Sequence, residues 1–287
     1  MDVSNKQFYW GQFPNEEETF WLRDTTTTRN PKLTEEEIDI LRDHPSLDTI
    51  RISNLRQDTF EYLIRTYGTQ FKNIIISHSQ LVEDWSLLGT LPGLEYLYFH
   101  WNQRITRLWD LSGNPNLKGL FLSNFTRLHS IEGIEKGRSL RQLFIGDAVW
   151  TTWVIDSLMP LSGMNLKYLV FCGGKILDND LSFLPTLEQL EAFDCPINLF
   201  TTEQCAWAVA NCPRVTGRIM QAKEDWQASD HHESLAAIVG KRKPTLSMEK
   251  DEKRIQKYVD HFETLKKRYE GVPYWNAFPE LKSDGKR

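Results

Sequence analysis

The side chains that could perform metal, phosphate or nucleophilic chemistry are poorly spaced for it in this sequence. The four cysteines lie in the second half of the chain and do not form the paired C-x-x-C spacing of zinc sites. His231 and His232 are adjacent, whereas two metal ligands on one helix face stand four residues apart. The segment CGG at 172–174 lacks the spacing and the Lys-Ser/Thr of a phosphate-binding loop, so a turn is expected there. We therefore expect no metal ion and no cofactor.

The cysteines also bear on the cellular compartment. A small secreted scaffold generally uses more of them than Cys172, Cys195, Cys205 and Cys212. The opening segment MDVSNKQFYWGQF lacks the basic start and apolar run of a signal peptide, and no segment approaches the ~20 apolar residues that span a bilayer. We expect a cytoplasmic protein with reduced, buried thiols; a Cys205–Cys212 disulfide is the alternative.

Composition and charge exclude two further classes. The 287 residues are 40% hydrophobic and 25% charged, with a net charge of -5, which speaks against disorder and against wholesale nucleic-acid binding. Residues 240–287 contain 13 Lys/Arg and 8 Asp/Glu, a net of +5, so residues 1–239 carry -10. The acids are interleaved in the basic end, which favours a solvated cap helix. The acidic remainder favours a basic partner through electrostatic steering.

Aromatic side chains suited to recognition gather in the stretch LEYLYFHWNQ, residues 94–103. Its alternation predicts a β-strand, yet the stretch is aromatic on both faces, which is unusual for a strand with one face in water. Tyrosine and tryptophan supply rigid contact area and a hydrogen-bonding group, and both are enriched at protein interfaces. What Tyr96, Tyr98, His100 and Trp101 face depends on the elements around them.

The stretch belongs to a repeat. Aligned on Leu94 it reads L-x-x-L-x-L-x-x-N, and successive starts are 24, 23, 23, 23, 26, 21 and 28 residues apart. Proline stands two residues before five of the starts, where its fixed φ and missing N–H are tolerated ahead of a strand. The starts are Leu47, Phe71, Leu94, Leu117, Leu140, Leu166, Leu187 and Val215, and the prolines are Pro45, Pro92, Pro115, Pro185 and Pro213.

The connections between the strands carry their own pattern. Apolar residues about three apart, as at Ile105, Leu108 and Leu111, predict 3₁₀ turns. The longer segment TTEQCAWAVANCP, residues 201–213, predicts an α-helix with a threonine cap.

This pattern resembles the leucine-rich repeat family, and the short-repeat type with 3₁₀ or irregular convex sides is most similar. The resemblance covers roughly residues 45–220 and implies an α/β solenoid, or horseshoe, with a parallel sheet on its concave side. The motif asparagine is present only at Asn102. In this family the concave surface is the usual site of recognition.

The ends of such an array need caps, because its core is otherwise exposed. We predict an N-terminal cap over 1–45, a hairpin followed by a helix in which Thr34 and Glu37 form a capping box. The array, with about seven to eight repeats, spans 46–221. Residues 222–287 are expected to form a polar linker to about residue 245 and then a helical cap and tail.

Alternation in the strands predicts which side chains point out of the sheet. The central outward column reads Arg51, Ile75, Tyr98, Phe121, Phe144, Val170, Glu191 and Ile219, and its middle five members form an apolar ribbon. An apolar ribbon exposed to water indicates an interaction site. The predicted partner-binding residues are Tyr96, Tyr98, His100, Trp101, Phe121, Phe144 and Tyr168, with Asp147 and Asp194 at the rim.

The same spacing argues against catalysis. Cys172 and His100 lie three repeats apart, about 14 Å at ~4.8 Å per strand, and Asp147 and Asp194 lie two repeats apart, roughly 10 Å. We therefore expect no enzyme and no catalytic residue, but a protein-binding module that acts as an adaptor or inhibitor. Alternatives are a substrate-recognition subunit for a separate catalytic chain, and a structural homo-oligomer or homodimer. The tail VPYWNAFPELK could also cover the ribbon.

Overall fold

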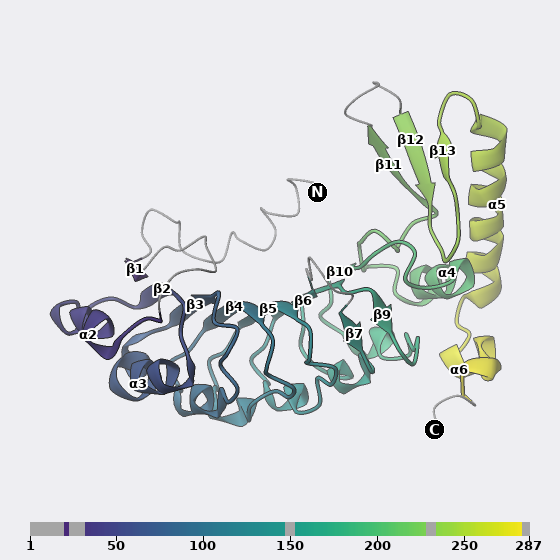
Figure 1. Ribbon diagram of the computed structural model, residues 1–287. Coiled ribbons are helices and arrows are strands. Elements are labelled where there is room, and N and C mark those ends of the chain that lie inside the picture. Colours follow the sequence, from purple (N-terminus) through teal and green to yellow (C-terminus); the bar gives the residue numbers. More distant parts are fainter. Residues whose placement is uncertain (1–19, 23–31, 147–152, 228–233, 283–287) are drawn as a thin grey trace. The chain divides into compact units, whose positions relative to one another are not determined.

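The computed structural model describes residues 20–22, 32–146, 153–227 and 234–282. The chain is an α/β protein with a large parallel sheet, whose eight strands follow the order β1-β2-β3-β4-β5-β6-β8-β10 (Figure 1). The chain divides into two compact units. The amino-terminal unit holds residues 1–128 and 132–142, and the carboxyl-terminal unit holds residues 129–131 and 143–287.

Strands of the amino-terminal unit come from consecutive repeats and pair in parallel. Ile74, Leu97 and Leu120 are partners in neighbouring strands and are fully buried, as the repeat frame predicts. Each apolar ridge is buried only by packing against the ridges beside it, so the common register follows from the leucine spacing. The strands are β1 (Phe20–Leu22), β2 (Thr49–Ser53), β3 (Asn73–Ser77), β4 (Tyr96–Asn102) and β5 (Gly119–Phe125).

The amino-terminal edge differs from the predicted hairpin. The described residues of that segment, 20–22, form β1, which pairs in parallel with β2, and the rest of the predicted hairpin lies outside the described residues. Parallel pairing brings Trp21 opposite Arg51, whose guanidinium lies 3.8 Å from the centre of the indole ring. A cation–π contact thus accompanies the edge pairing.

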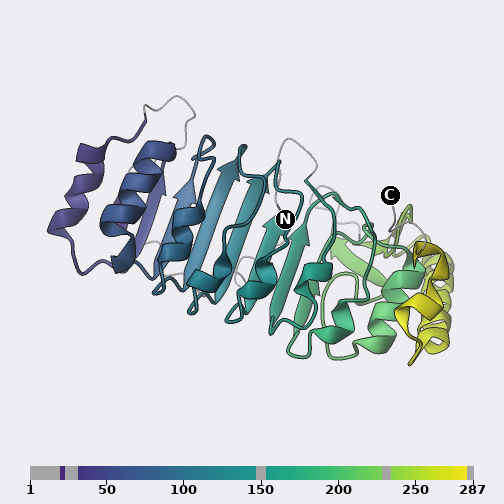
Figure 2. The same ribbon diagram turned by 90° about the horizontal axis from the view of Figure 1, so that it is seen from below.

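Helical connections cover one face of these strands, as the view in Figure 2 shows. Helix α2 (Glu35–Ile38) begins at the predicted capping box, in which the backbone N–H of Glu37 donates to Thr34 Oγ1 and that of Thr34 donates to Glu37 Oε2. Helix α3 (Gln57–Tyr67) was not anticipated. The 3₁₀ turns are Asp39–Asp43, Gly68–Gln70, Ser86–Thr90, Leu111–Gly113 and Ile134–Lys136.

A left-handed residue stands at or just after the carboxyl end of each of four strands in this unit. Asn54, His78, Trp101 and Asn124 have φ values of 62°, 50°, 66° and 58°. This conformation turns the next side chain back toward the core, and the buried residues at those next positions are Leu55, Ser79, Asn102 and Phe125. The repeat pattern includes this buried position, but it did not predict the left-handed residue that precedes it.

Two buried asparagines tie neighbouring repeats together. Asn102 donates to the carbonyls of Ser79 and Val82 and accepts from the N–H groups of Arg104 and Ile105, all at 2.8–3.0 Å. Asn114, which the motif does not include, donates to the carbonyls of Leu88 and Leu91. Buried backbone groups need hydrogen-bond partners, and these side-chain amides supply partners for backbone groups in the turns between the strands.

The carboxyl-terminal unit contains the remaining strands of the large sheet. They are β6 (Gln142–Gly146, of which Gln142 belongs to the amino-terminal unit), β8 (Tyr168–Cys172) and β10 (Ala192–Asp194). A small parallel pair, β7 (Val154–Ile155) and β9 (Lys175–Ile176), accompanies the 3₁₀ turns Met159–Leu161 and Leu184–Thr186.

The register predicted for β10 is wrong by three residues. Ala192 pairs with Tyr168 and Asp194 with Val170, so the repeat starts at Leu190 and not at Leu187. Leu184, Leu187 and Leu190 are spaced by three, which makes the frame ambiguous. Pro185, read as the residue ahead of a strand, instead lies at the start of a 3₁₀ turn, where proline is equally tolerated.

Residues 222–245, expected to be a polar linker, instead contain strands. β11 (Lys223–Gln227), β12 (Ser234–Ile238) and β13 (Thr245–Ser247) form an antiparallel sheet. Its core is Ala236, Ile238 and Leu246 packed against Ile255 of α5 (Glu252–Tyr269), the helix predicted from its apolar stripe. β11 itself is half-buried to exposed, and its pairing with β12 adds it to this sheet.

The tail is docked within the carboxyl-terminal unit. Helix α4 (Thr202–Asn211) starts at the predicted Thr201 cap, and its Trp207 indole N–H donates to the carbonyl of Val272 at 2.7 Å. Tyr274 of α6 (Tyr274–Ala277) accepts a hydrogen bond from Gln204, and Phe278 is buried beside Tyr274 just before the 3₁₀ turn Pro279–Lys282. The tail aromatics Tyr274 and Phe278 are thus buried against their own unit, which leaves the alternative of a tail-covered ribbon without support.

Candidate protein-binding face

Strand β4 presents an aromatic row on the outward side of the sheet in the amino-terminal unit. Tyr96, Tyr98 and His100 are half-buried there, whereas Leu97 and Phe99 between them are fully buried. Tyr98 pairs with Ile75 of β3 and with Phe121 of β5, so the predicted column is confirmed in this unit. We call the outward side chains Tyr96, Tyr98, His100, Trp101, Phe121 and the adjoining His78 the aromatic face.

Contacts between aromatic rings connect four residues of the aromatic face. The rings of Tyr98 and His100 are stacked, with centroids 6.4 Å apart and an interplanar angle of 9°. His78 contacts Trp101 edge to face at 5.3 Å and His100 at 5.9 Å. His100 Nδ1 lies 3.0 Å from Ser123 Oγ, a hydrogen bond that fixes the imidazole. The four rings therefore form one contiguous cluster.

Trp101 occupies a backbone conformation that does not suit it. Asparagine and histidine tolerate the left-handed region, and they hold three of the four equivalent positions, Asn54, His78 and Asn124. A bulky aromatic residue with φ of 66° is an outlier, and such a residue costs of order 1–3 kcal/mol. Outliers of this kind gather at functional sites, so Trp101 is a candidate for a functional role.

Phe121 departs from the prediction of an exposed ribbon. Its side chain is 3% exposed, and Ile75 is also buried. A Cβ placed on Gly119 would lie 2.5 Å from Cδ1 of Tyr96 and 2.8 Å from Cε2 of Phe121, so both rings cover the glycine. The rings of Tyr96 and Phe121 thus fill the space that Gly119 leaves in the row. Burial of the Tyr96 ring raises the pKa of Tyr96.

Gly119→Ala should therefore destabilise the protein by about 1–3 kcal/mol, the cost of overpacking a well-filled site. The added methyl group cannot fit unless the rings of Tyr96 and Phe121 move. The matched control is Gly93→Ala, where an added Cβ meets no atom within 4 Å. Chemical denaturation of both variants measures the difference, and equal stabilities would contradict the packing described for Gly119.

The other predicted site residues lie in the carboxyl-terminal unit or outside the described residues. Phe144 is half-buried. Tyr168 donates its hydroxyl to Glu191 Oε2 at 2.7 Å, and this hydrogen bond raises the pKa of Tyr168. Asp194 is only 8% exposed and stands beside Val170 in the central column, so its assignment to a solvent-exposed rim is wrong. Asp147 lies outside the described residues.

His78 was missed by sequence reasoning. In its own repeat His78 directly precedes Ser79, the position equivalent to Asn102, just as Trp101 directly precedes Asn102. This equivalence could have identified His78 from the sequence. A repeat pattern defined by its leucines does not include that position.

The cysteines are free thiols in the structure, so no Cys205–Cys212 disulfide is formed. Cys195, Cys205 and Cys212 are buried as expected, and burial raises the pKa of Cys212 to about 12. Cys172 at the end of β8 is exposed, contrary to the expectation for all four.

Comparison with known proteins adds no relative. The sequence matches no protein-family model, and a search of curated proteins found no match. Within the described ranges, no group of three or more His, Cys, Asp or Glu residues could hold a metal ion. None of the helices in the described part of the chain is both long and apolar enough to cross a membrane.

Proposed function

We propose that this chain is a cytoplasmic, non-catalytic leucine-rich repeat solenoid that binds another protein through the aromatic face, as an adaptor or inhibitor. The solenoid assignment is supported by parallel strands that recur every 23–24 residues from β2 to β5 with a helical or 3₁₀ connection after each. Stacked units of this kind bury one continuous ridge of apolar side chains.

The observation that carries the proposal is the combination of Tyr96, Tyr98 and Trp101 on one outward surface. A sheet face that needed only solubility would carry polar residues at these positions. Instead, Tyr96 and Tyr98 are half-buried, and Tyr98 belongs to a ring cluster in which Trp101 is held in a costly backbone conformation. Rigid aromatic side chains with one hydrogen-bonding group are the residues that dominate binding energy at protein interfaces.

The charge of this surface defines the partner further. The outward positions of β2–β5 carry Arg51 and His100 but no carboxylate. The partner surface that covers the aromatic face should therefore be apolar or neutral. The preference for a basic partner, argued from the charge of -10 in residues 1–239, must arise elsewhere on the protein.

Tyr98→Ala tests the proposal. Wild type and variant are used to capture proteins from the native host, and a protein retained by wild type alone is purified and its affinity measured by calorimetry. Tyr98→Ala should weaken this affinity by about 2 kcal/mol, roughly 30-fold in Kd. The melting temperature should change little, because surface substitutions typically alter stability within about 0.5 kcal/mol.

Trp226→Ala is the matched control, because Trp226 is 48% exposed and lies in the other unit. Loss of stability with unchanged affinity in Tyr98→Ala would refute the binding role. Sedimentation separates the alternatives: a dimer that Tyr98→Ala dissociates identifies a structural homo-oligomer. A retained protein with catalytic activity of its own identifies a substrate-recognition subunit.

A further inference from the structure

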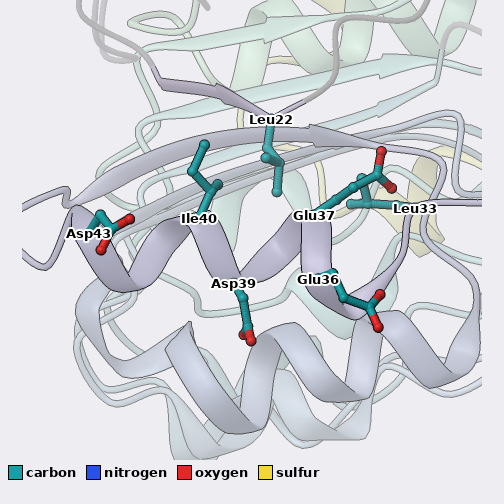
Figure 3. A pocket seen from close by; sticks show the side chains of 7 residues that line it. All are labelled: Leu22, Leu33, Glu36, Glu37, Asp39, Ile40 and Asp43. Carbon is teal, nitrogen blue, oxygen red and sulfur yellow. The ribbon is translucent and has the colours of Figure 1, made fainter.

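An open pocket of about 690 Å³ lies in the amino-terminal unit between β1 and the helix that begins at Glu35 (Figure 3). None of its lining residues belongs to the aromatic face. The hollow is wide open to solvent, so it suits a segment laid across it better than an enclosed small ligand. The pocket is therefore a second candidate surface, and it is independent of the proposed function.

The interior of the pocket is aliphatic. Leu22 at the end of β1 and Leu33 ahead of α2 are buried, and Ile40 beside them is 46% exposed. A single exposed isoleucine is ordinary. Here it lines the same pocket as the two leucines, and Figure 3 shows Ile40 and Leu22 on the same side of the helical segment, which leaves an aliphatic surface for an apolar side chain.

Acidic side chains form the walls. Glu36 and Asp43 are exposed and line the pocket, and Figure 3 shows them toward opposite ends of the helical segment, with Ile40 between them along the chain. Glu37 adds a third carboxylate, and its Oε2 caps α2 by accepting from the N–H of Thr34. Among the described lining residues there is no Lys, Arg or His, so this described part of the pocket is apolar within and negative at its margin.

Two cations in the described part of this region are paired with other carboxylates. Lys32 forms an ion pair with Asp58, and Arg42 binds Oδ2 of Asp39 at 2.9 Å. The other oxygen of Asp39 accepts the hydroxyls of Tyr62 and Tyr67, and these hydrogen bonds lower the pKa of Asp39. Among the described residues, no Lys or Arg forms an ion pair with Glu36 or Asp43.

We propose that this pocket binds a basic segment of a partner protein. One aliphatic side chain of the segment packs on Leu22, Leu33 and Ile40, and the lysines or arginines that flank it pair with Glu36 and Asp43. Charge complementarity at the margin of the pocket steers and orients the basic segment. The aliphatic contact in the interior excludes water from the flanking ion pairs. This surface accounts for a basic partner where the aromatic face does not.

The probe is a fluorescein-labelled, blocked heptapeptide, Gly-Lys-Arg-Leu-Lys-Arg-Gly, and its binding is followed by fluorescence anisotropy. Wild type should bind it, and the affinity should fall as salt is raised from about 50 to about 300 mM, because exposed charges are screened. The double variant Glu36→Lys/Asp43→Lys should bind at least roughly tenfold more weakly. Ile40→Ser should weaken binding without any change of charge.

Two controls make the assignment specific. Glu188→Lys/Glu249→Lys changes the net charge equally at exposed positions in the other unit and should bind as wild type does. A peptide with serine in place of leucine should bind several-fold more weakly. Equal loss in both double variants, or equal binding of the serine peptide, would overturn the proposal. Self-association that Glu36→Lys/Asp43→Lys abolishes would identify a second copy as the occupant and overturn it too. Tyr98→Ala should leave peptide binding unchanged, so failure here is distinct from failure of the aromatic face.

Discussion

Leu120→Ala is expected to lower the free energy of unfolding by about 2–5 kcal/mol, the range for truncating a fully buried leucine. Leu120 is 0% exposed and pairs with Leu97 in the ridge of apolar side chains beneath the sheet. Its removal leaves a cavity that strands on both sides cannot close, because hydrogen bonds between the strands hold them at a fixed spacing.

Leu81→Ala is the matched control, since Leu81 is 45% exposed in the same unit and loses the same atoms. Its effect should stay within about 0.5 kcal/mol. Urea denaturation of both variants gives the two values on one scale. A loss under about 1 kcal/mol for Leu120→Ala would mean that the leucine frame does not define the core.

Trp101→Asn is expected to separate binding from stability. Asparagine is at ease in the left-handed conformation that Trp101 adopts, and Asn54 and Asn124 hold the equivalent positions. Relief of backbone strain should offset the lost contact with His78, so the free energy of unfolding should change by less than about 1 kcal/mol. Partner affinity should fall by roughly 2 kcal/mol or more, as for a central tryptophan of an interface.

Thermal denaturation and calorimetry on the same preparations measure both quantities. Trp101→His copies the residue found at position 78 and keeps an aromatic ring, so its affinity should lie between those of wild type and Trp101→Asn. If Trp101→Asn loses stability while affinity is retained, the indole serves packing alone and the aromatic face is not the binding site.

The parallel register of β2–β5 and the starts of α2 and α4 could be predicted from local patterns in the sequence. A ridge such as Ile74, Leu97 and Leu120 is apolar at one position per repeat, and a slip by one residue would turn it into solvent, so few registers compete. The capping boxes at Thr34 and Thr201 depend on contacts three residues apart, which a local pattern contains in full.

Features that depend on competing or distant contacts could not be predicted from the sequence and are seen in the folded chain. Leu187 and Leu190 satisfy the same pattern, and pairing with Tyr168 in β8 selects the second. The burial of Phe121 follows from the glycine beside it, and the strand β11 exists because β12 pairs with it. In the aromatic face, the sequence indicated Tyr96, Tyr98 and His100 by alternation, because side-chain direction in a strand is local. The left-handed turn at Trp101 and its contact with His78 were not predictable, since the energy that holds a strained residue comes from neighbours 23 positions away.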